Sequence, residues 1–210
     1  MDGQVTVNSK QARVGQLVGG EDKVRVKGQL VGVKPKLVYL LYHKPVGVVC
    51  TNDQTVEGNL VDAINYPQRV FAVGRLDKAS EGLLLLTNDG AIFNQILRAE
   101  HAHQKEYLVT VDKPLTDEFV TQMAAGVPIL DTITLPCQVT RIDPTTFNIV
   151  LTQGLNLQIR RMCQALGYRV LKLQRIRIMN LQLDLLPVNQ CRKLTSQEMK
   201  QLQVLLNARV

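Results

Sequence analysis

An uninterrupted apolar run from Leu83 to Leu86 stands out in the hydrophobic pattern of the chain. A charged turn that ends at Gly82 precedes the run, and polar, turn-forming residues from Thr87 to Gly90 follow it. A run of this length between turn signals is typical of a buried strand, although its length alone does not exclude a helix. A charged turn that leads into a buried strand holds its side chains on a rigid support, which is a common construction for active sites.

The remaining hydrophobic pattern predicts strands along most of the chain. Val5 and Val7, and later Val24 and Val26, alternate with polar neighbours, so two short strands are expected near the N-terminus. Further strands are expected at 37–42, 70–73, 105–111, 127–135, 137–142, 147–151, 170–173 and 176–183.

Helices are expected where apolar residues recur every three to four positions. The expected helices are 59–64, a helix after Asp89 with Ile92, Phe93, Ile96 and Leu97 on one face, 116–125, 156–167, and a last helix after Thr195. Thr116 and Asn156 are expected as N-caps, and Thr195 with Glu198 as a capping box. Cys163 falls on the apolar face of the fourth helix, so we expect it in the core and not as a nucleophile.

The composition bounds the class of protein. The chain has 210 residues, of which 45% are apolar, enough for one large domain or one domain with a small appendage. The net charge of +7 favours a polyanionic partner, although it could also serve solubility alone. Aromatic residues make up only 4% and Trp is absent, which argues against a protein that binds single strands on repeated stacking platforms.

The cysteines and histidines predict no metal site. Cys50, Cys137, Cys163 and Cys191 are far apart and are expected to be reduced thiols of a cytoplasmic protein. His101 and His103 are expected in a solvated loop. No signal peptide and no apolar run of membrane length is present, so we expect a soluble protein with no membrane partner.

Residues 144–183 contain no Asp or Glu. The same stretch carries six basic residues: Arg160, Arg161, Arg169, Lys172, Arg175 and Arg177. Because a solvated surface normally mixes charges of both signs, this run indicates phosphate binding.

The charged turn before the apolar run contains Arg75, Asp77 and Lys78. A lone Arg-Leu-Asp tripeptide would favour a plain loop in which Asp77 caps a turn or pairs with Arg75. The longer string from Gly74 to Gly90, however, resembles the second motif of RNA pseudouridine synthases, in the branch that acts on single uridines of ribosomal RNA. The resemblance implies that Asp77 is the catalytic residue.

Three further motifs of that family are present, and all four occur in the family's order along the chain. The resemblance therefore covers roughly residues 37–206. Lys44-Pro45-Val46-Gly47 resembles the first motif, and Lys105-Glu106-Tyr107 resembles the motif whose Tyr sits against the target base. Residues 154–162 resemble the motif Gly-x-Asn-x-Gln-Ile-Arg-Arg-Met, which implies that Arg160 pairs with Asp77. Leu157 departs from that motif at a position that is usually polar. Residues 177–180 match the large-subunit type F members of the family.

The resemblance implies an α+β pseudouridine synthase fold: a central mixed, mostly antiparallel sheet flanked by helices, with a basic cleft. It implies isomerisation of a uridine in large-subunit ribosomal RNA, or also in a tRNA anticodon loop, by a monomer without a cofactor. The target base would be flipped out of its helix. The catalytic residues would be Asp77, Tyr107 and Arg160. The expected RNA contacts are Lys44, Arg75, Lys78, Lys105, Asn156, Gln158, Arg161, Arg175 and Arg177.

The N-terminal part is expected to be a separate, smaller domain. Residues 1–34 resemble the last strands of an S4-like RNA-binding domain followed by a linker, and residues 35–210 would be the catalytic domain. Met1 leaves no room for the two helices that open such a domain, so a partial domain is expected.

Two other functions remain open at this point. A non-catalytic RNA-binding or ribosome-assembly protein would use the basic run equally well but leaves Asp77 unexplained. A phosphate-binding enzyme that uses Gly74 to Gly82 as its loop fits neither the GxxxxGK nor the GxGxxG spacing.

Overall fold

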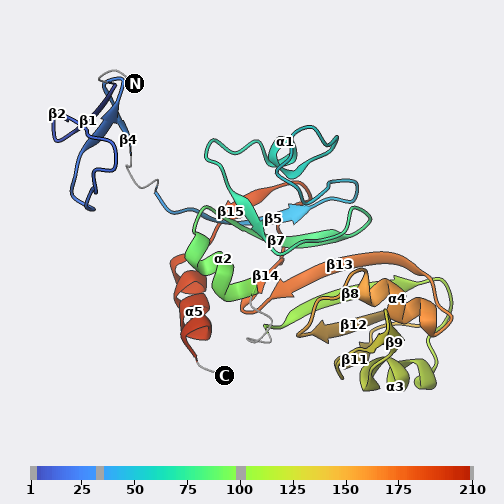
Figure 1. The fold of residues 1–210 in the computed structure, drawn as a ribbon. Coiled ribbons are helices and arrows are strands. Elements are labelled where there is room, and N and C mark those ends of the chain that lie inside the picture. The colour runs from blue at the N-terminus through green and yellow to red at the C-terminus, as the bar shows by residue number, and fades with distance from the viewer. Residues whose placement is uncertain (1–3, 32–35, 98–102, 209–210) are drawn as a thin grey trace. The chain divides into compact units, whose positions relative to one another are not determined.

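The computed structural model describes residues 4–31, 36–97 and 103–208, in two compact units that comprise residues 1–37 and 38–210. Most of the linker expected at 33–36 and His101 lie outside the described residues. The smaller unit is a four-stranded antiparallel sheet in the order β2-β1-β3-β4 (Figure 1). Its strands are β1 (Val5–Val7), β2 (Lys10–Gln11), β3 (Val24–Val26) and β4 (Gln29–Val31).

Two tight turns shape the smaller unit. Asn8 and Ser9 connect β1 to β2, and Lys27 and Gly28 connect β3 to β4. All four have positive φ, the backbone geometry that hairpin turns of two residues require. Val7 is the one buried side chain among the described residues of this unit, so little apolar area stabilises it.

The larger unit is built on a nine-stranded sheet that is antiparallel except at one place. Its main path runs β11-β12-β8-β13-β7-β5-β15, while β14 pairs with β13 and β6 pairs with β7. The strands are β5 (Tyr39–Lys44), β6 (Phe71–Val73), β7 (Glu81–Thr87), β8 (Lys105–Val111), β11 (Gln138–Arg141), β12 (Thr146–Leu151), β13 (Val170–Ile178), β14 (Leu181–Gln182) and β15 (Cys191–Lys193). The predicted mixed, mostly antiparallel sheet is confirmed.

Helices cover both halves of this sheet (Figure 1). The helices are α1 (Leu60–Ile64), α2 (Gly90–Leu97), α3 (Asp117–Ala125), α4 (Gln158–Ala165) and α5 (Ser196–Asn207). Ile92 of α2 and Leu202 of α5 share a core with β5 and β7, whereas Phe119 of α3 and Met162 of α4 share one with β8 and β12. The apolar run at the centre of β7 is fully buried, as predicted.

Three details of the expected elements are wrong. The segments 170–173 and 176–178 are not separate strands, because β13 runs through both with two register shifts, and residues 181–182 form β14. The strand expected at 127–135 is a small hairpin of β9 (Pro128–Ile129) and β10 (Thr132–Ile133). Asn156 does not cap α4: Leu157 is the N-cap residue, in a left-handed conformation, and makes no side-chain cap.

The one parallel pairing in the nine-stranded sheet joins β7 to β13 near its centre. It is short, because the register covers only Gln174 with Glu81 and Arg175 with Gly82. The two halves of the sheet therefore meet where β7 begins, directly after the turn that carries Asp77.

Candidate active site

The turn of residues 75–80, here called the Asp77 turn, is held through its backbone at five consecutive residues. Arg175 Nη1 donates to the Arg75 carbonyl at 3.3 Å, and the Leu76 amide donates to Cys50 Sγ at 3.4 Å. The remaining three contacts are from the Ser80 amide to the Asp77 carbonyl (3.0 Å), from the Gly47 amide to the Lys78 carbonyl (2.8 Å), and from Arg160 Nη2 to the Ala79 carbonyl (2.8 Å). Such a turn has little freedom to move, which is how a preorganised site is supported.

The side chains of the Asp77 turn divide into two groups. Leu76 and Ser80 are buried and anchor the turn in the core. Arg75, Asp77 and Lys78 are exposed. The described part of the chain offers the Asp77 carboxylate no hydrogen bond or ion pair, so it is available to a substrate.

Two arginines contact the Asp77 turn near its two ends. Arg175 reaches from β13 to the Arg75 carbonyl and, through Nε, to the Leu83 carbonyl at 2.8 Å. Arg160 reaches from α4 to Ala79 and to Ser80 Oγ, the latter at 3.4 Å. Arg175 Nη2 and Arg160 Nε are buried and have no partner among the described residues. The structure therefore brings Arg160 to the Asp77 turn, but its bond goes to the backbone two residues beyond Asp77.

Lys44 lies beneath the same turn. It is the last residue of β5, its side chain is fully buried, and its Nζ donates to the Pro45 carbonyl at 2.8 Å. Burial lowers the pKa of Lys44 from its ordinary value, and the nearby Cys50 and Asp77 oppose that change. The turn that follows Lys44 donates a hydrogen bond from the Gly47 amide to the Asp77 turn. The first and second motifs of the family are therefore in direct contact.

Tyr107 is connected to the Asp77 turn by apolar packing. It is half-buried on β8 and packs against the cluster that contains Leu76, the neighbour of Asp77. Tyr107 also packs against the core of the other half of the sheet, so it lies where the two halves meet. Arg175 is its register partner on β13.

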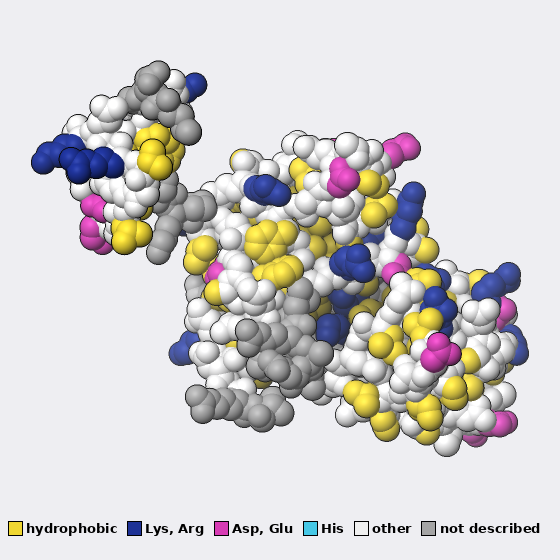
Figure 2. All heavy atoms as spheres, viewed as in Figure 1, with side chains coloured by type: hydrophobic (Ala, Val, Ile, Leu, Met, Phe, Trp, Pro, Cys, Tyr) yellow, Lys and Arg dark blue, Asp and Glu magenta, His cyan; other side chains and the backbone are white. Residues whose placement is uncertain are grey.

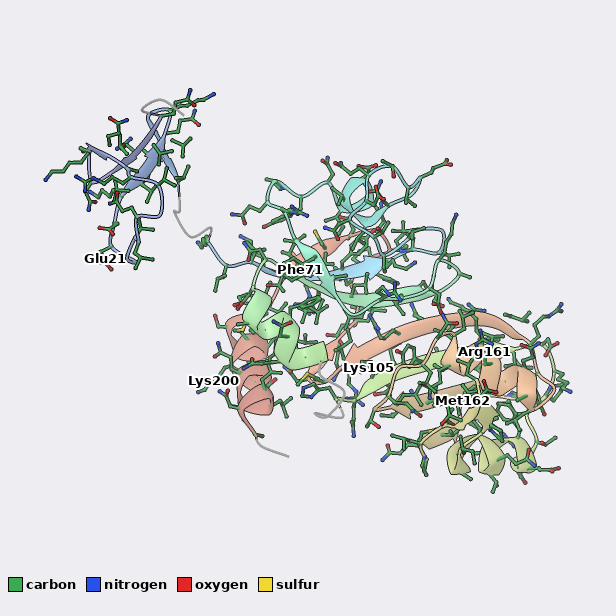
Figure 3. The ribbon with its side chains drawn as sticks, in the orientation of Figure 1. Glu21, Phe71, Lys105, Arg161, Met162 and Lys200 are labelled. Carbon is green, nitrogen blue, oxygen red and sulfur yellow. The ribbon has the colours of Figure 1, made fainter. Side chains whose placement is uncertain are left out.

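Basic side chains gather in a hollow of the larger unit (Figure 2). Figure 2 shows Lys and Arg side chains in a hollow between the part that carries β5 and β7 and the part that carries β8, β13 and α4. Lys105, labelled in Figure 3, opens β8 and donates from Nζ to the His103 carbonyl at 3.0 Å. Burial, with a contribution from Arg175, lowers the pKa of Lys105. Such a hollow suits a polyanion.

Several residues with a predicted RNA-contact role have side chains that are buried or paired within the fold. Lys44, Gln158 and Arg175 have side chains that are buried, so they offer RNA no surface. Gln158 instead accepts a hydrogen bond from the Leu155 amide at 2.9 Å. Arg177 is committed to an ion pair with Glu106.

Other predicted contacts keep some exposed surface. Asn156 is exposed, and Arg161, labelled in Figure 3, donates from Nε to its carbonyl at 3.0 Å. Arg161 therefore orders the loop before α4. Cys163 is fully buried, as predicted, and burial raises the pKa of its thiol to about 12.

Gly82 allows a close contact between two strands, which its position at the end of the charged turn did not predict. Its φ is +118°, and a Cβ at this position would collide with the backbone of Arg175 on β13. No pattern in the sequence signals that contact, because the two residues are far apart along the chain.

Comparison with known proteins agrees with this geometry. A family model described as RNA pseudouridylate synthase matches residues 38–165. The dual-specificity RNA pseudouridine synthase RluF of Escherichia coli K12 is 50% identical over 199 residues, which are 94% of this chain and 69% of that protein. The chain belongs to the RNA pseudouridylate synthase family. The family identified from the motifs, including its similarity to type F members, is confirmed.

More distant relatives of the synthase support the same conclusion. The ribosomal large subunit pseudouridine synthase B of Bacillus subtilis is 32% identical over 97% of this chain and 87% of its own length. A crystal structure of a pseudouridylate synthase superposes with a TM-score of 0.76 at 29% identity, over 95% of this chain and 89% of that one. The protein is an isomerase that acts on RNA, so the non-catalytic and phosphate-loop alternatives are wrong. None of the helices in the described ranges is long and apolar enough to cross a membrane.

Proposed function

We propose that the synthase converts a specific uridine of large-subunit ribosomal RNA into pseudouridine, with Asp77 as its catalytic carboxylate and without a cofactor. The observation that carries this proposal is the Asp77 turn, which presents one unpaired carboxylate from a backbone held at five consecutive residues. Relatives named for the large ribosomal subunit support the class of RNA. The dual specificity of RluF suggests a second RNA, for which we propose a tRNA anticodon loop.

The chemistry requires a carboxylate and no redox step. The bond between C1′ of the ribose and N1 of uracil breaks, the base rotates, and C5 bonds to C1′. C5 then loses its proton and N1 gains one, so atoms and charge balance. Breaking a glycosidic bond builds positive charge on the sugar, which a placed carboxylate stabilises or attacks. Asp77 would act by attack on the sugar, attack on the base, or removal of a sugar proton.

The exposed neighbours of Asp77 suit base flipping. A uridine inside a stem must leave the helix, at a cost of a few kcal/mol. Arg75 and Lys78 flank Asp77 and are exposed, so they would bind phosphates, with Arg75 filling the gap left by the base. Tyr107 would stack on the uracil and assist removal of the C5 proton.

The smaller unit would add affinity for RNA. We propose it as an S4-like RNA-binding element, because residues 1–37 contain seven Lys and Arg against three Asp and Glu. Its size and turns fit an accessory element and not a catalytic one.

Replacing Asp77 by Asn tests the proposal. The substitution keeps the shape of the side chain and removes its charge, so we expect at least about a thousandfold loss of turnover with RNA binding unchanged, as for other essential catalytic groups. The measurement is tritium release from large-subunit ribosomal RNA transcribed with C5-tritiated uridine. Asp131→Asn is the matched control, since Asp131 is exposed in a left-handed turn position that Asn also favours. Substantial tritium release by Asp77→Asn would remove Asp77 from the mechanism.

A further inference from the structure

A pocket opens beside the Asp77 turn, where Gly74 and Arg75 line it. It measures about 670 Å³. Six of its lining residues carry the argument: Cys50, Phe71, Ala72, Gly74, Arg75 and Phe93. Gly74 and Arg75 lead directly into Asp77, so the pocket and the catalytic carboxylate are presented by the same short segment.

Two aromatic rings form one wall of this pocket. Phe71 of β6 and Phe93 of α2 contact each other edge to face, with centroids 5.0 Å apart and planes at 88°. Both are only half-buried, so part of their aromatic surface remains open. Figure 3 labels Phe71, and Figure 2, in the same orientation, shows a hydrophobic patch in that area beside the hollow that holds the basic side chains. Aromatic surface open to solvent next to a polyanion site is suited to stacking with bases.

The floor and the rim of the pocket differ in charge. Cys50 is tied to the Asp77 turn, because its sulfur accepts from the Leu76 amide at 3.4 Å. The exposed side chain of Arg75 supplies a positive charge at the rim. An apolar wall combined with a cation at the edge fits a flat, weakly polar ring that is attached to a phosphate backbone.

We propose that this pocket binds an unpaired nucleobase of the RNA substrate, distinct from the target uracil. The proposal rests on the proposed function of the Asp77 turn. When one uridine leaves a stem, its former partner or its neighbour loses pairing and stacking. Holding that base in a pocket offsets part of the cost of flipping and makes the enzyme select sequences with a suitable base near the target.

A second pocket of the same unit provides a control. It measures about 480 Å³ and lies beside α1, where Tyr66 and Ile64 line it. Tyr66 is half-buried like Phe93, but none of the residues lining that pocket belongs to the Asp77 turn. Losing its ring should cost comparable packing without affecting RNA.

The test is a double-mutant cycle that combines a substitution in the pocket with a change in the RNA. The modified uridine is first mapped on a large-subunit ribosomal RNA transcript. A short stem-loop around it is then made with each neighbouring unpaired nucleotide replaced in turn by an abasic ribose. Phe93→Ala should raise KM for the intact stem-loop about tenfold, a loss typical of one stacked base, with kcat unchanged. One abasic position should raise the KM of the unsubstituted enzyme equally and cause no further loss in Phe93→Ala.

The controls separate docking from folding and from catalysis. Tyr66→Ala should leave KM unchanged, and Phe93→Leu, which keeps bulk but not the flat ring, should fall between Phe93→Ala and the unsubstituted enzyme. The same cycle is also measured as binding affinity, by fluorescence anisotropy of a labelled stem-loop. Binding needs no turnover, so this measurement tests the pocket even if Asp77 is not the catalytic residue. Two outcomes would overturn the proposal. The first is that the KM increases from Phe93→Ala and from the abasic nucleotide multiply at every abasic position. The second is that the KM of Phe93→Ala stays within about twofold of the unsubstituted enzyme, where a tenfold increase is expected.

Discussion

At the scale of single residues, the site depends on a close approach between two backbones. Gly82 on β7 faces Arg175 on β13, and the missing side chain of Gly82 lets the two strands pair in parallel. The same Arg175 uses its guanidinium to hold Arg75 and Leu83. One position on β13 thus fixes both ends of the segment that carries Asp77.

Gly82→Ala should destabilise the protein and reduce turnover. A Cβ would collide with backbone atoms that cannot rotate away, at a φ that side chains rarely adopt, so we expect a loss of at least about 2 kcal/mol of unfolding free energy. Urea denaturation measures it. Gly90→Ala is the control, because nothing lies within 4 Å of a Cβ there. Equal stability of the two variants would contradict the steric argument.

Arg175→Met should lower kcat about tenfold or more while KM for RNA stays within about threefold, because misplacing a catalytic group costs rate more than binding. Arg175 is buried and does not offer surface to RNA, so its effect must pass through the Asp77 turn. Steady-state kinetics with the stem-loop RNA measure the split. Arg141→Met removes another arginine that is bonded within the fold, to Asp117, and should leave kcat unchanged. A rise in KM alone would instead place Arg175 at the RNA.

At the scale of elements, α5 is attached to the edge of the sheet by a charged cap. Thr195 Oγ1 accepts from the Glu198 amide at 3.1 Å, and the Glu198 carboxylate accepts from the Thr195 amide at 2.7 Å. Arg192 of β15 donates twice to the same carboxylate, at 2.7 and 2.8 Å. Because β15 pairs with β5, this cap supports the strand that ends at Lys44.

This cap makes a contribution to stability that depends on pH. Hydrogen bonds from Arg192, and then from Thr195, lower the pKa of Glu198 from 4.5 to about 2. A lowered pKa means that the stabilisation is present above pH 4.5 and is lost as the pH falls towards 2. Glu198→Gln should therefore lower Tm by about 2–4 °C at pH 7, the shift expected for roughly 1 kcal/mol in a chain of this length.

The measurement is the Tm difference between Glu198→Gln and the unsubstituted protein from pH 7 to pH 2. The difference should shrink below pH 4.5 and disappear near pH 2. Glu57→Gln, at an exposed position, is the control and should leave Tm unchanged at pH 7. A Tm difference that is independent of pH would show that Glu198 contributes through its shape and not through its charge.

At the scale of the whole molecule, the two units have separate sheets and separate cores. Buried apolar clusters occur throughout residues 38–210, whereas the described residues of the smaller unit bury only Val7. The smaller unit is rich in Lys and Arg, and we proposed above that it adds affinity for RNA.

Removing residues 1–37 should leave the unfolding transition of residues 38–210 and kcat on the stem-loop RNA unchanged. KM for a full-length ribosomal RNA transcript should rise about tenfold, because a tethered second binding element raises effective concentration. In the full chain, Lys10→Gln with Lys27→Gln should give part of that rise, since both side chains are exposed. A drop in kcat on the stem-loop would show that the smaller unit takes part in the site.

The sequence by itself determined most of the elements and the family. The apolar run at 83–86 and the caps at Thr116 and Thr195 act through neighbours a few positions away, so their pattern is sufficient to predict them. The motifs likewise identified the protein as an RNA-modifying enzyme, because their order and spacing can be read directly from the sequence.

Only the tertiary structure decided which charged side chains are exposed and which are buried. A basic residue looks the same in sequence whether water, RNA or a backbone carbonyl receives its hydrogen bonds. Lys44 and Arg175 are buried because strands distant along the chain enclose them, as the bond from Arg175 to Leu83 shows across 92 positions. The need for glycine at position 82 arises from the same long-range contact. Burial and backbone approach are properties of the packed sheet, and no local pattern encodes them.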